Sequence, residues 1–77
     1  MSLRLRDLVV GERGKIRSLQ KGNKAYRAKL LAMGLLPGTE FSVTRLAPMG
    51  DPVEIRVRGF SLSLRKDEAD VLLVDKL

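Results

Sequence analysis

The clearest pattern in the chain is an alternation of apolar and polar residues in two adjacent segments, Val53 to Val57 and Phe60 to Leu64. Such alternation is typical of a β-strand with one apolar face. If Arg58 and Gly59 form a two-residue turn, every apolar side chain of the hairpin lies on one face, and a shift of one residue would destroy this agreement. The predicted pairs are Val57 with Phe60, Ile55 with Leu62 and Val53 with Leu64. Arg58 fits a type I′ turn poorly, so the pattern predicts the register and leaves the turn type open.

The segments before the hairpin predict a helical turn, a strand and a helix. Leu5 to Leu8 favours a short helical turn, and Lys15 to Leu19 favours a first strand. Asn23 can cap a helix that runs to about Met33, because its side-chain oxygen can accept a free amide of the first turn. Gly34 then ends this helix as a left-handed cap.

Two more strands are predicted, one on each side of the hairpin. Thr39 to Ala47 favours a strand that bends or bulges near residues 44–45, because its apolar residues change parity there. After the hairpin, Arg65 to Asp70 favours one helical turn, in which only Ala69 is small and apolar enough to pack inward. Val71 to Val74 favours the last strand.

These elements predict a mainly β protein, a small SH3-like five-stranded barrel with one inserted α-helix (about Asn23 to Met33) and short helical turns. The chain has 77 residues, which is enough for one small core. We therefore expect residues 1–77 to form a single domain.

The helix and the residues after it are rich in apolar side chains. On a helical period, Tyr26, Leu30 and Met33 form one stripe that can lie on the sheet. Leu31 falls among basic residues, so it is either covered by another loop or exposed as an anchor for a partner. With Leu35 and Leu36 added, the cluster is denser than one stripe requires, and some members should face solvent, a second copy or a partner.

Turn-forming residues stand where helices end and strands turn. Their expected role is backbone geometry, through which they shape the rims of the barrel. These residues are Gly34, Pro37, Gly38, Gly50, Asp51, Pro52 and Gly59.

The composition removes much of the chemistry on which enzymes depend. The chain has no Cys and no His, so it lacks thiolates, the commonest general base and the commonest transition-metal ligand. No Gly-x-x-x-x-Gly-Lys-Ser/Thr loop for a nucleotide phosphate is present either. Asp51 and Glu54 offer carboxylates, but two carboxylates alone do not define a cation site. We therefore expect no enzyme activity, no resident cofactor and no metal site.

Charge and hydropathy narrow the setting. Fifteen Lys and Arg against nine Asp and Glu give a net charge of +6, which suits nucleic acid, anionic lipid or an acidic protein surface. No segment approaches the roughly 20 apolar residues of a membrane helix, and the N-terminus lacks the apolar core of a signal peptide. These features predict a cytoplasmic protein without direct membrane insertion.

Three motifs in this order closely resemble the FeoA family, ferrous iron transport protein A. They are Leu-Leu-Ala-Met-Gly-Leu-Leu-Pro-Gly-Thr-Glu at 30–40, Ala-Pro-Met-Gly-Asp-Pro at 47–52 and Val-Arg-Gly-Phe-Ser-Leu-Ser-Leu-Arg at 57–65. The resemblance extends from about Leu5 to Val74. It implies a small cytosolic SH3-like protein of prokaryotic ferrous iron uptake, working beside FeoB, a membrane transporter with a cytoplasmic nucleotide-hydrolysing domain.

Two kinds of side chain are candidates for contact with such a partner. Apolar residues of the helix and loops can line a groove, while basic residues of the hairpin can attract an acidic surface and speed encounter. Ordinary core packing and a solvated face remain the alternatives. The candidate partner-binding residues are Leu30, Leu31, Met33, Leu35, Met49, Arg56 and Arg58. A second basic region, with the same two interpretations, contains Lys21, Lys24, Arg27 and Lys29.

Three functions are compatible with these observations. The first is an adaptor that binds the cytoplasmic part of FeoB and modulates its assembly or activity, with a weak homo-oligomer as an added possibility. The second is a nucleic-acid-binding barrel, suggested by the +6 charge. It is disfavoured because Phe41 and Phe60 are expected in the core, which leaves little surface for base stacking. The third, direct binding or sensing of Fe(II), is suggested by the family alone.

Overall fold

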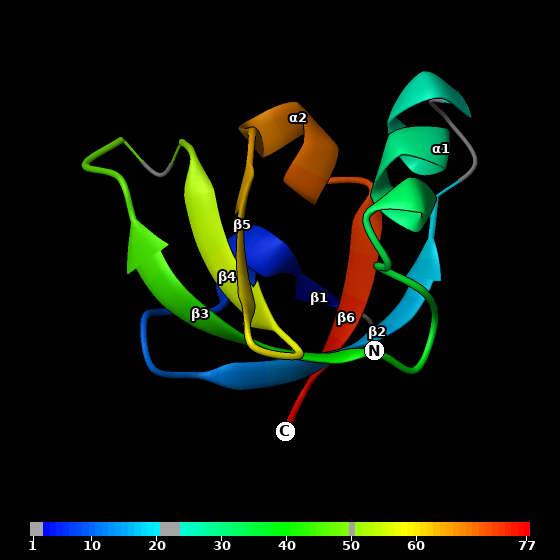
Figure 1. Cartoon of the computed structure of the whole chain (residues 1–77). Coiled ribbons are helices and arrows are strands. Elements are labelled where there is room, and N and C mark those ends of the chain that lie inside the picture. Colours follow the sequence, from blue (N-terminus) through cyan, green and yellow to red (C-terminus); the bar gives the residue numbers. More distant parts are fainter. Residues whose placement is uncertain (1–2, 21–23, 50) are drawn as a thin grey trace.

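A computed structural model describes residues 3–20, 24–49 and 51–77 of the chain. It contains one antiparallel sheet with the strand order β1-β6-β2-β3-β4-β5. Figure 1 shows the sheet curling into an incomplete barrel, with α2 at the top of the view and α1 at the upper right. The elements are β1 (Leu3–Arg4), the 3-10 turn η1 (Leu5–Asp7), β2 (Arg13–Leu19), α1 (Lys24–Ala32), β3 (Glu40–Leu46), β4 (Val53–Val57), β5 (Phe60–Leu64), α2 (Lys66–Ala69) and β6 (Leu72–Lys76).

The mainly β architecture is confirmed, but the prediction of five strands was wrong. The described residues form a sheet of six, because β1 adds an edge strand in which Leu3 pairs with Val74 and Arg4 with Leu73. A strand of two residues has too few positions to show alternation. Its pairing is therefore decided by β6, which lies next to it only in the folded chain.

The predicted hairpin register is confirmed in full, with Val57 opposite Phe60, Ile55 opposite Leu62 and Val53 opposite Leu64. Arg58 has a φ of 51° and Gly59 a φ of 84°, and two positive values are what a type I′ turn requires. A left-handed conformation costs a residue such as Arg roughly 1–2 kcal/mol. The sheet tolerates this cost because the register places the apolar side chains of both strands on one face.

Two bulges bend the long strands around the core. The register between β3 and β4 shifts between Val43 and Arg45, which confirms the predicted bend. A second shift, between Ile16 and Ser18, interrupts the pairing of β2 with β6. Ile16 and Leu19 are both buried, and two inward residues with an odd spacing are the sequence signal of that bulge. Such bends allow short strands to curl.

Helix α1 lies on the core along the predicted stripe. Leu30 is buried, and Tyr26, Met33 and Leu31 are half-buried and pack against the same core. Gly34, with a φ of 89°, ends the helix as predicted. Asn23, the predicted N-terminal cap, lies outside the described residues, as does Gly50. In the described part of the chain, no helix is long and apolar enough to span a membrane.

In the middle of the sheet, an aromatic ring packs closely against the backbone of the neighbouring strand. The ring of Phe41 on β3 covers Gly14 on β2, and these two residues are direct partners in the ladder. A Cβ atom at position 14 would lie 2.6 Å from Phe41 Cζ and 3.1 Å from the carbonyl oxygen of Asp75. Gly14 therefore provides the space that the aromatic ring fills.

Helix α2 buries a carboxylate that was not predicted to be buried. Ala69 is buried as expected, but Glu68 is also only 4% exposed, so the prediction that Ala69 alone packs inward was wrong. Glu68 Oε2 lies 2.5 Å from Lys29 Nζ on α1, and Glu68 Oε1 accepts a 3.0 Å hydrogen bond from the Arg65 amide. These partners offset the cost of removing the charge from water. The hydrogen bond from Lys29 and that from the Arg65 amide lower the pKa of Glu68 below its ordinary value.

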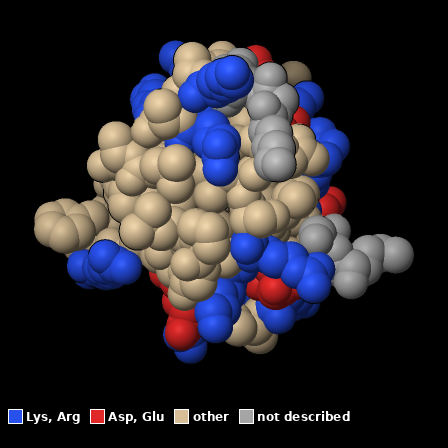
Figure 2. Space-filling model, turned by 90° about the vertical axis from the view of Figure 1, so that its right-hand side faces the viewer, with Lys and Arg blue, Asp and Glu red and all other residues tan. Residues whose placement is uncertain are grey.

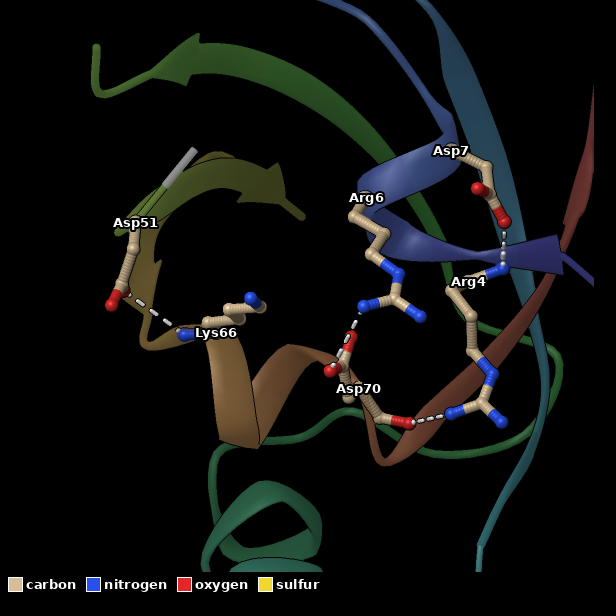
Figure 3. A network of polar contacts seen from close by, with 6 residues as sticks. All are labelled: Arg4, Arg6, Asp7, Asp51, Lys66 and Asp70. Carbon is tan, nitrogen blue, oxygen red and sulfur yellow. Dashed lines mark hydrogen bonds and ion pairs between the residues drawn. The ribbon is translucent and has the colours of Figure 1, made fainter. Parts of the chain in front are cut away.

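Polar contacts also attach the N-terminus and the loop before β4 to α2 (Figure 3). Arg4 Nη1 donates to the carbonyl oxygen of Asp70 at 2.6 Å, and Arg6 Nη1 lies 3.5 Å from Asp70 Oδ2. The Lys66 amide donates to Asp51 Oδ1 at 3.0 Å. Asp51 thus contributes to the predicted turn by a direct contact with the first residue of α2.

Candidate docking surface

An apolar groove lies between the end of α1 and the tip of the β4–β5 hairpin. Its volume is about 300 Å³. The groove is lined by Met33, Gly34, Val57, Arg58, Phe60, Ser61 and Leu62. Segments more than twenty positions apart in the sequence meet here, because α1 ends beside the hairpin tip after lying on the core.

Phe60 is the most prominent apolar side chain of this groove. It is 72% exposed, although its cross-strand partner Val57 is buried, so the prediction that Phe60 belongs to the core was wrong. Along the inner face of β5, Leu64 is fully buried, Leu62 is half-buried and Phe60 is exposed. The hairpin therefore extends past the rim of the core, and its last inward-facing residue borders the groove.

The structure separates the apolar candidates for partner binding. Leu30 and Leu35 are 0% exposed, so naming them as contact residues was wrong; their contribution is to the core beneath. Met33 lines the groove, whereas Leu31 is half-buried outside its lining. Met49 is 91% exposed and precedes β4, at the end of that strand away from the turn. It therefore does not belong to the same surface.

Basic side chains border the groove on one side. Arg56 and Arg58 are exposed, and both line a second depression of about 230 Å³ together with Arg13, which pairs with Glu40 at 3.0 Å. Arg58 lines both depressions. A ligand in the apolar groove would therefore meet positive charge at the hairpin tip.

The second basic region is less available for contact with a partner than its sequence indicates. Lys29 forms the ion pair with Glu68, Lys24 and Arg27 are exposed on α1, and Lys21 lies outside the described residues. Figure 2 shows the side of the molecule at the right of Figure 1, where basic side chains gather above and below a broad uncharged area.

The two carboxylates considered for a cation have other partners. The Asp51 carboxylate accepts a hydrogen bond from the Lys66 amide, and Glu54 Oε1 lies 3.5 Å from the Thr44 hydroxyl. Within the described ranges, no three His, Cys, Asp or Glu residues lie close enough together to hold a metal ion.

Sequence reasoning did not find Phe60 as a surface residue. Its place in the alternation is that of a core residue, so the pattern predicted burial. The available signal was its position beside the two-residue turn, where a hairpin can extend beyond the core.

The curled six-stranded sheet with its bulges and capping helix defines a small SH3-like barrel with an exposed apolar groove. Residues 3–76 match the FeoA domain, and the chain therefore belongs to the FeoA family. The resemblance inferred from the three motifs is confirmed.

Solved structures of family members share this fold. A FeoA-like protein from Clostridium acetobutylicum, determined by NMR, is 38% identical, with a TM-score of 0.89 over 99% of this chain and 87% of that one. The FeoA of Stenotrophomonas maltophilia, crystallised with zinc and described as a procaryotic SH3 domain protein, is 26% identical. Its TM-score is 0.82 over 95% of this chain and 89% of that one.

A curated relative is much longer. The Fe(2+) transport protein A/Fe(2+) transporter FeoB fusion protein of Porphyromonas gingivalis strain ATCC BAA-308 / W83 is 32% identical over 73 residues. The match covers 95% of this chain and 8% of the fusion protein. The chain therefore corresponds to a small part of that protein.

Proposed function

We propose that this chain is an accessory protein of prokaryotic ferrous iron uptake, which binds the cytoplasmic part of FeoB and modulates its assembly or activity. The observation that carries the proposal is the fusion protein, in which a relative of this chain is joined to FeoB in one polypeptide. A covalent link holds two modules at high effective concentration, an advantage when the modules bind each other. We place this contact in the cytoplasm, because the proposed partner is the cytoplasmic part of FeoB.

In this proposal the chain acts through contact and the transporter supplies the chemistry. The sequence has no Gly-x-x-x-x-Gly-Lys-Ser/Thr loop for a nucleotide phosphate and neither His nor Cys, so we assign nucleotide hydrolysis and ion movement to FeoB. The groove beside Phe60 supplies the contact surface. An exposed aromatic residue next to an apolar depression has the properties of a binding hot spot, because its burial removes a large apolar area from water.

The basic rim contributes mainly to encounter and specificity. Arg56 and Arg58 lie beside the groove on a molecule of net charge +6, so an acidic partner surface is attracted over a distance of about one Debye length, ~8 Å at physiological salt. Such steering raises the association rate more than it lowers the dissociation rate. Added salt should therefore slow association.

The proposal is tested by measuring the affinity of this chain for FeoB from the same genome, purified in nanodiscs. Phe60→Ala should lower the affinity by at least about tenfold, as loss of a hot-spot aromatic residue does. Met49→Ala is the matched control, because Met49 is also exposed but lies outside the groove lining; its affinity should stay within about twofold of the wild type. Failure of the wild-type chain to bind FeoB would contradict the proposal.

The exposure of Phe60 also supports a second candidate function. The exposed ring of Phe60, which lines the groove together with Arg58, can stack on a base while the guanidinium groups of Arg58 and of Arg56 in the neighbouring depression contact phosphates. Binding of single-stranded RNA that persists at moderate salt and depends on Phe60 would favour this function, because contact with phosphates alone weakens steeply as salt rises.

A further inference from the structure

The outer edge of β5 has unpaired backbone groups at defined positions. β5 ends the strand order, and β4 is its only strand neighbour in the described sheet. In a hairpin with a two-residue turn, the two residues that flank the turn, here Val57 and Phe60, form a hydrogen-bonded pair. Hydrogen-bonded and non-hydrogen-bonded pairs then alternate along the ladder. Phe60, Leu62 and Leu64 therefore direct their backbone groups toward β4. Ser61 and Ser63 direct theirs away from it.

Nothing else in the described chain takes up these outward groups. Ser61 and Ser63 are exposed, and their amide and carbonyl groups have no hydrogen-bond partner outside the sheet among the described residues. They are two positions apart on one strand, so their outward groups repeat at about 6.8 Å, the spacing at which a neighbouring strand pairs. This edge has the geometry to accept another strand.

The groove continues from this edge. A strand added beside β5 would direct alternate side chains to the inner face, next to Leu62 and Phe60, where Met33 and Gly34 form the opposite wall. An apolar side chain fits there, because the lining is mainly apolar. Backbone pairing and side-chain insertion are thus possible for one extended segment.

The charges around β5 indicate what kind of segment can bind to its edge. Arg56 and Arg58 lie at the hairpin end of β5, and Arg65 and Lys66 follow its other end; all four are exposed. The nearby carboxylates of Glu54 and Asp51 have contacts within this chain, and Asp67 is the remaining exposed acid after β5. Positive charge therefore predominates at both ends, and an acidic segment is complementary to it.

We propose that the outer edge of β5 binds an extended acidic segment of the partner protein as an added strand, with one apolar side chain of that segment in the groove beside Phe60. This inference rests on the proposed function and specifies how the partner binds. A second copy of this chain is a poorer occupant. Antiparallel pairing of two β5 strands would place Arg58 of one copy near Arg65 of the other, and each copy carries a charge of +6.

The decisive variant is Ser63→Pro, with Ser63→Ala as its matched control. Proline removes the outward amide hydrogen and leaves the ladder to β4 intact, because an edge strand tolerates proline where the amide faces solvent. Alanine removes only the hydroxyl group. We expect Ser63→Pro to lower the affinity for FeoB in nanodiscs by at least about tenfold and Ser63→Ala to change it by less than about twofold.

A second measurement uses the wild-type protein and therefore does not depend on how the variant folds. Hydrogen–deuterium exchange should show that the Ser61 and Ser63 amides are slowed on addition of FeoB, since an added strand protects outward amides. The inference is wrong if both amides exchange at the free rate in the complex. It is also wrong if Ser63→Pro binds like the wild type while Phe60→Ala binds weakly; the proposed function then stands.

The remaining outcomes also give a definite answer. If the wild-type chain does not bind FeoB at all, the proposed function fails and the inference fails with it. Dimerisation of the free chain that Ser63→Pro abolishes would make a second copy the occupant. RNA binding that depends on Phe60 and is unaffected by Ser63→Pro would assign the surface to nucleic acid. Either the dimerisation or the RNA binding would overturn the inference.

Discussion

The two edges of the sheet are protected in different ways. At one edge, the short strand β1 leads into η1, whose Leu5 is fully buried, and Arg4 and Arg6 contact Asp70. At the other edge, β5 is longer and begins with an exposed Phe60. Exposed edges invite pairing with other chains, and natural proteins shorten them, cover them or flank them with charge. Here one edge is short and fixed, while the other is open and flanked by basic residues.

This difference shows what an alternating pattern can predict. Alternation identifies the face of a strand on which a side chain lies, because side chains point to opposite faces in turn. It does not identify how far along the strand the core extends. Leu64 and Phe60 share a face of β5, yet one is fully buried and the other is 72% exposed. The following predictions test this contrast between the fixed and the open edge.

The largest expected effect is at the fixed edge. Leu5→Ala should lower the free energy of unfolding by about 2–5 kcal/mol, because it leaves a cavity in the core. Phe60→Ala at the open edge should lower it by less than about 1 kcal/mol, since little burial is lost. Urea unfolding followed by circular dichroism measures both. Equal losses in the two variants would mean that the hairpin tip belongs to the core.

The next effect is expected at Gly14, between the two edges. Gly14→Ala places a methyl group against the Phe41 ring and should cost about 1–3 kcal/mol of stability, because the ring or the backbone must move. The double variant Gly14→Ala with Phe41→Leu should lose less than the sum of the two single losses, since the smaller side chain leaves room for the methyl group. Additive losses measured by urea unfolding would contradict this packing.

An effect of similar size, with a defined pH dependence, is expected where α1 meets α2. Glu68→Gln should lower stability by about 1–3 kcal/mol near pH 7, because it removes a charge-assisted hydrogen bond from a buried carboxylate. Folding lowers the pKa of Glu68, first through Lys29 and then through the Arg65 amide, so ionised Glu68 stabilises the fold above its ordinary pKa of 4.5. This contribution is lost as the pH falls through the lowered pKa.

The measurement is urea unfolding of the wild type and Glu68→Gln from neutral pH into the acid range. The gap between them should close as the pH drops. The hydrogen bond from Lys76, with the Val9 amide, also lowers the pKa of Glu12, so both proteins should keep some acid sensitivity. A gap that stays constant with pH would show that the stability does not depend on the charge of Glu68.

The smallest effect is expected at the hairpin tip, and it has the opposite sign. Arg58→Asn should raise stability by about 0.5–1 kcal/mol, because Asn tolerates the positive φ and Asn-Gly favours a type I′ turn. The same variant should weaken FeoB binding, since Arg58 borders the groove. Thermal unfolding measures the gain in stability, and the nanodisc binding assay measures the loss of affinity for FeoB. A loss of stability would show that Arg58 does not adopt the left-handed conformation.

Much of the fold was predictable from local pattern. The hairpin register followed from two runs with matched alternation, the bend in β3 followed from a change of parity, and the Gly34 cap followed from the end of a helical stripe. Each of these features is decided within about a dozen residues. Local sequence is sufficient for them, because the backbone period and the side-chain pattern must agree.

The candidate docking surface was predicted only in part. Arg58 and Met33 were named and line the groove, and Arg56 was named and lines the neighbouring depression. Leu30 and Leu35 lie in the core, and Phe60 was assigned to the core although it is exposed. A dense run of leucines does not reveal which members face inward. That depends on which other segments cover them.

The sequence by itself determined the class of fold, the pairing within the hairpin, the basic character of the chain and its membership of the FeoA family. Only the tertiary structure decided that β1 completes the sheet, that Glu68 is buried against Lys29, and that β5 extends past the core to leave an open edge beside a groove. The physical reason is that strand pairing and helical periods are set by neighbours in the sequence. Burial is set by whatever segments the folded chain brings together in space.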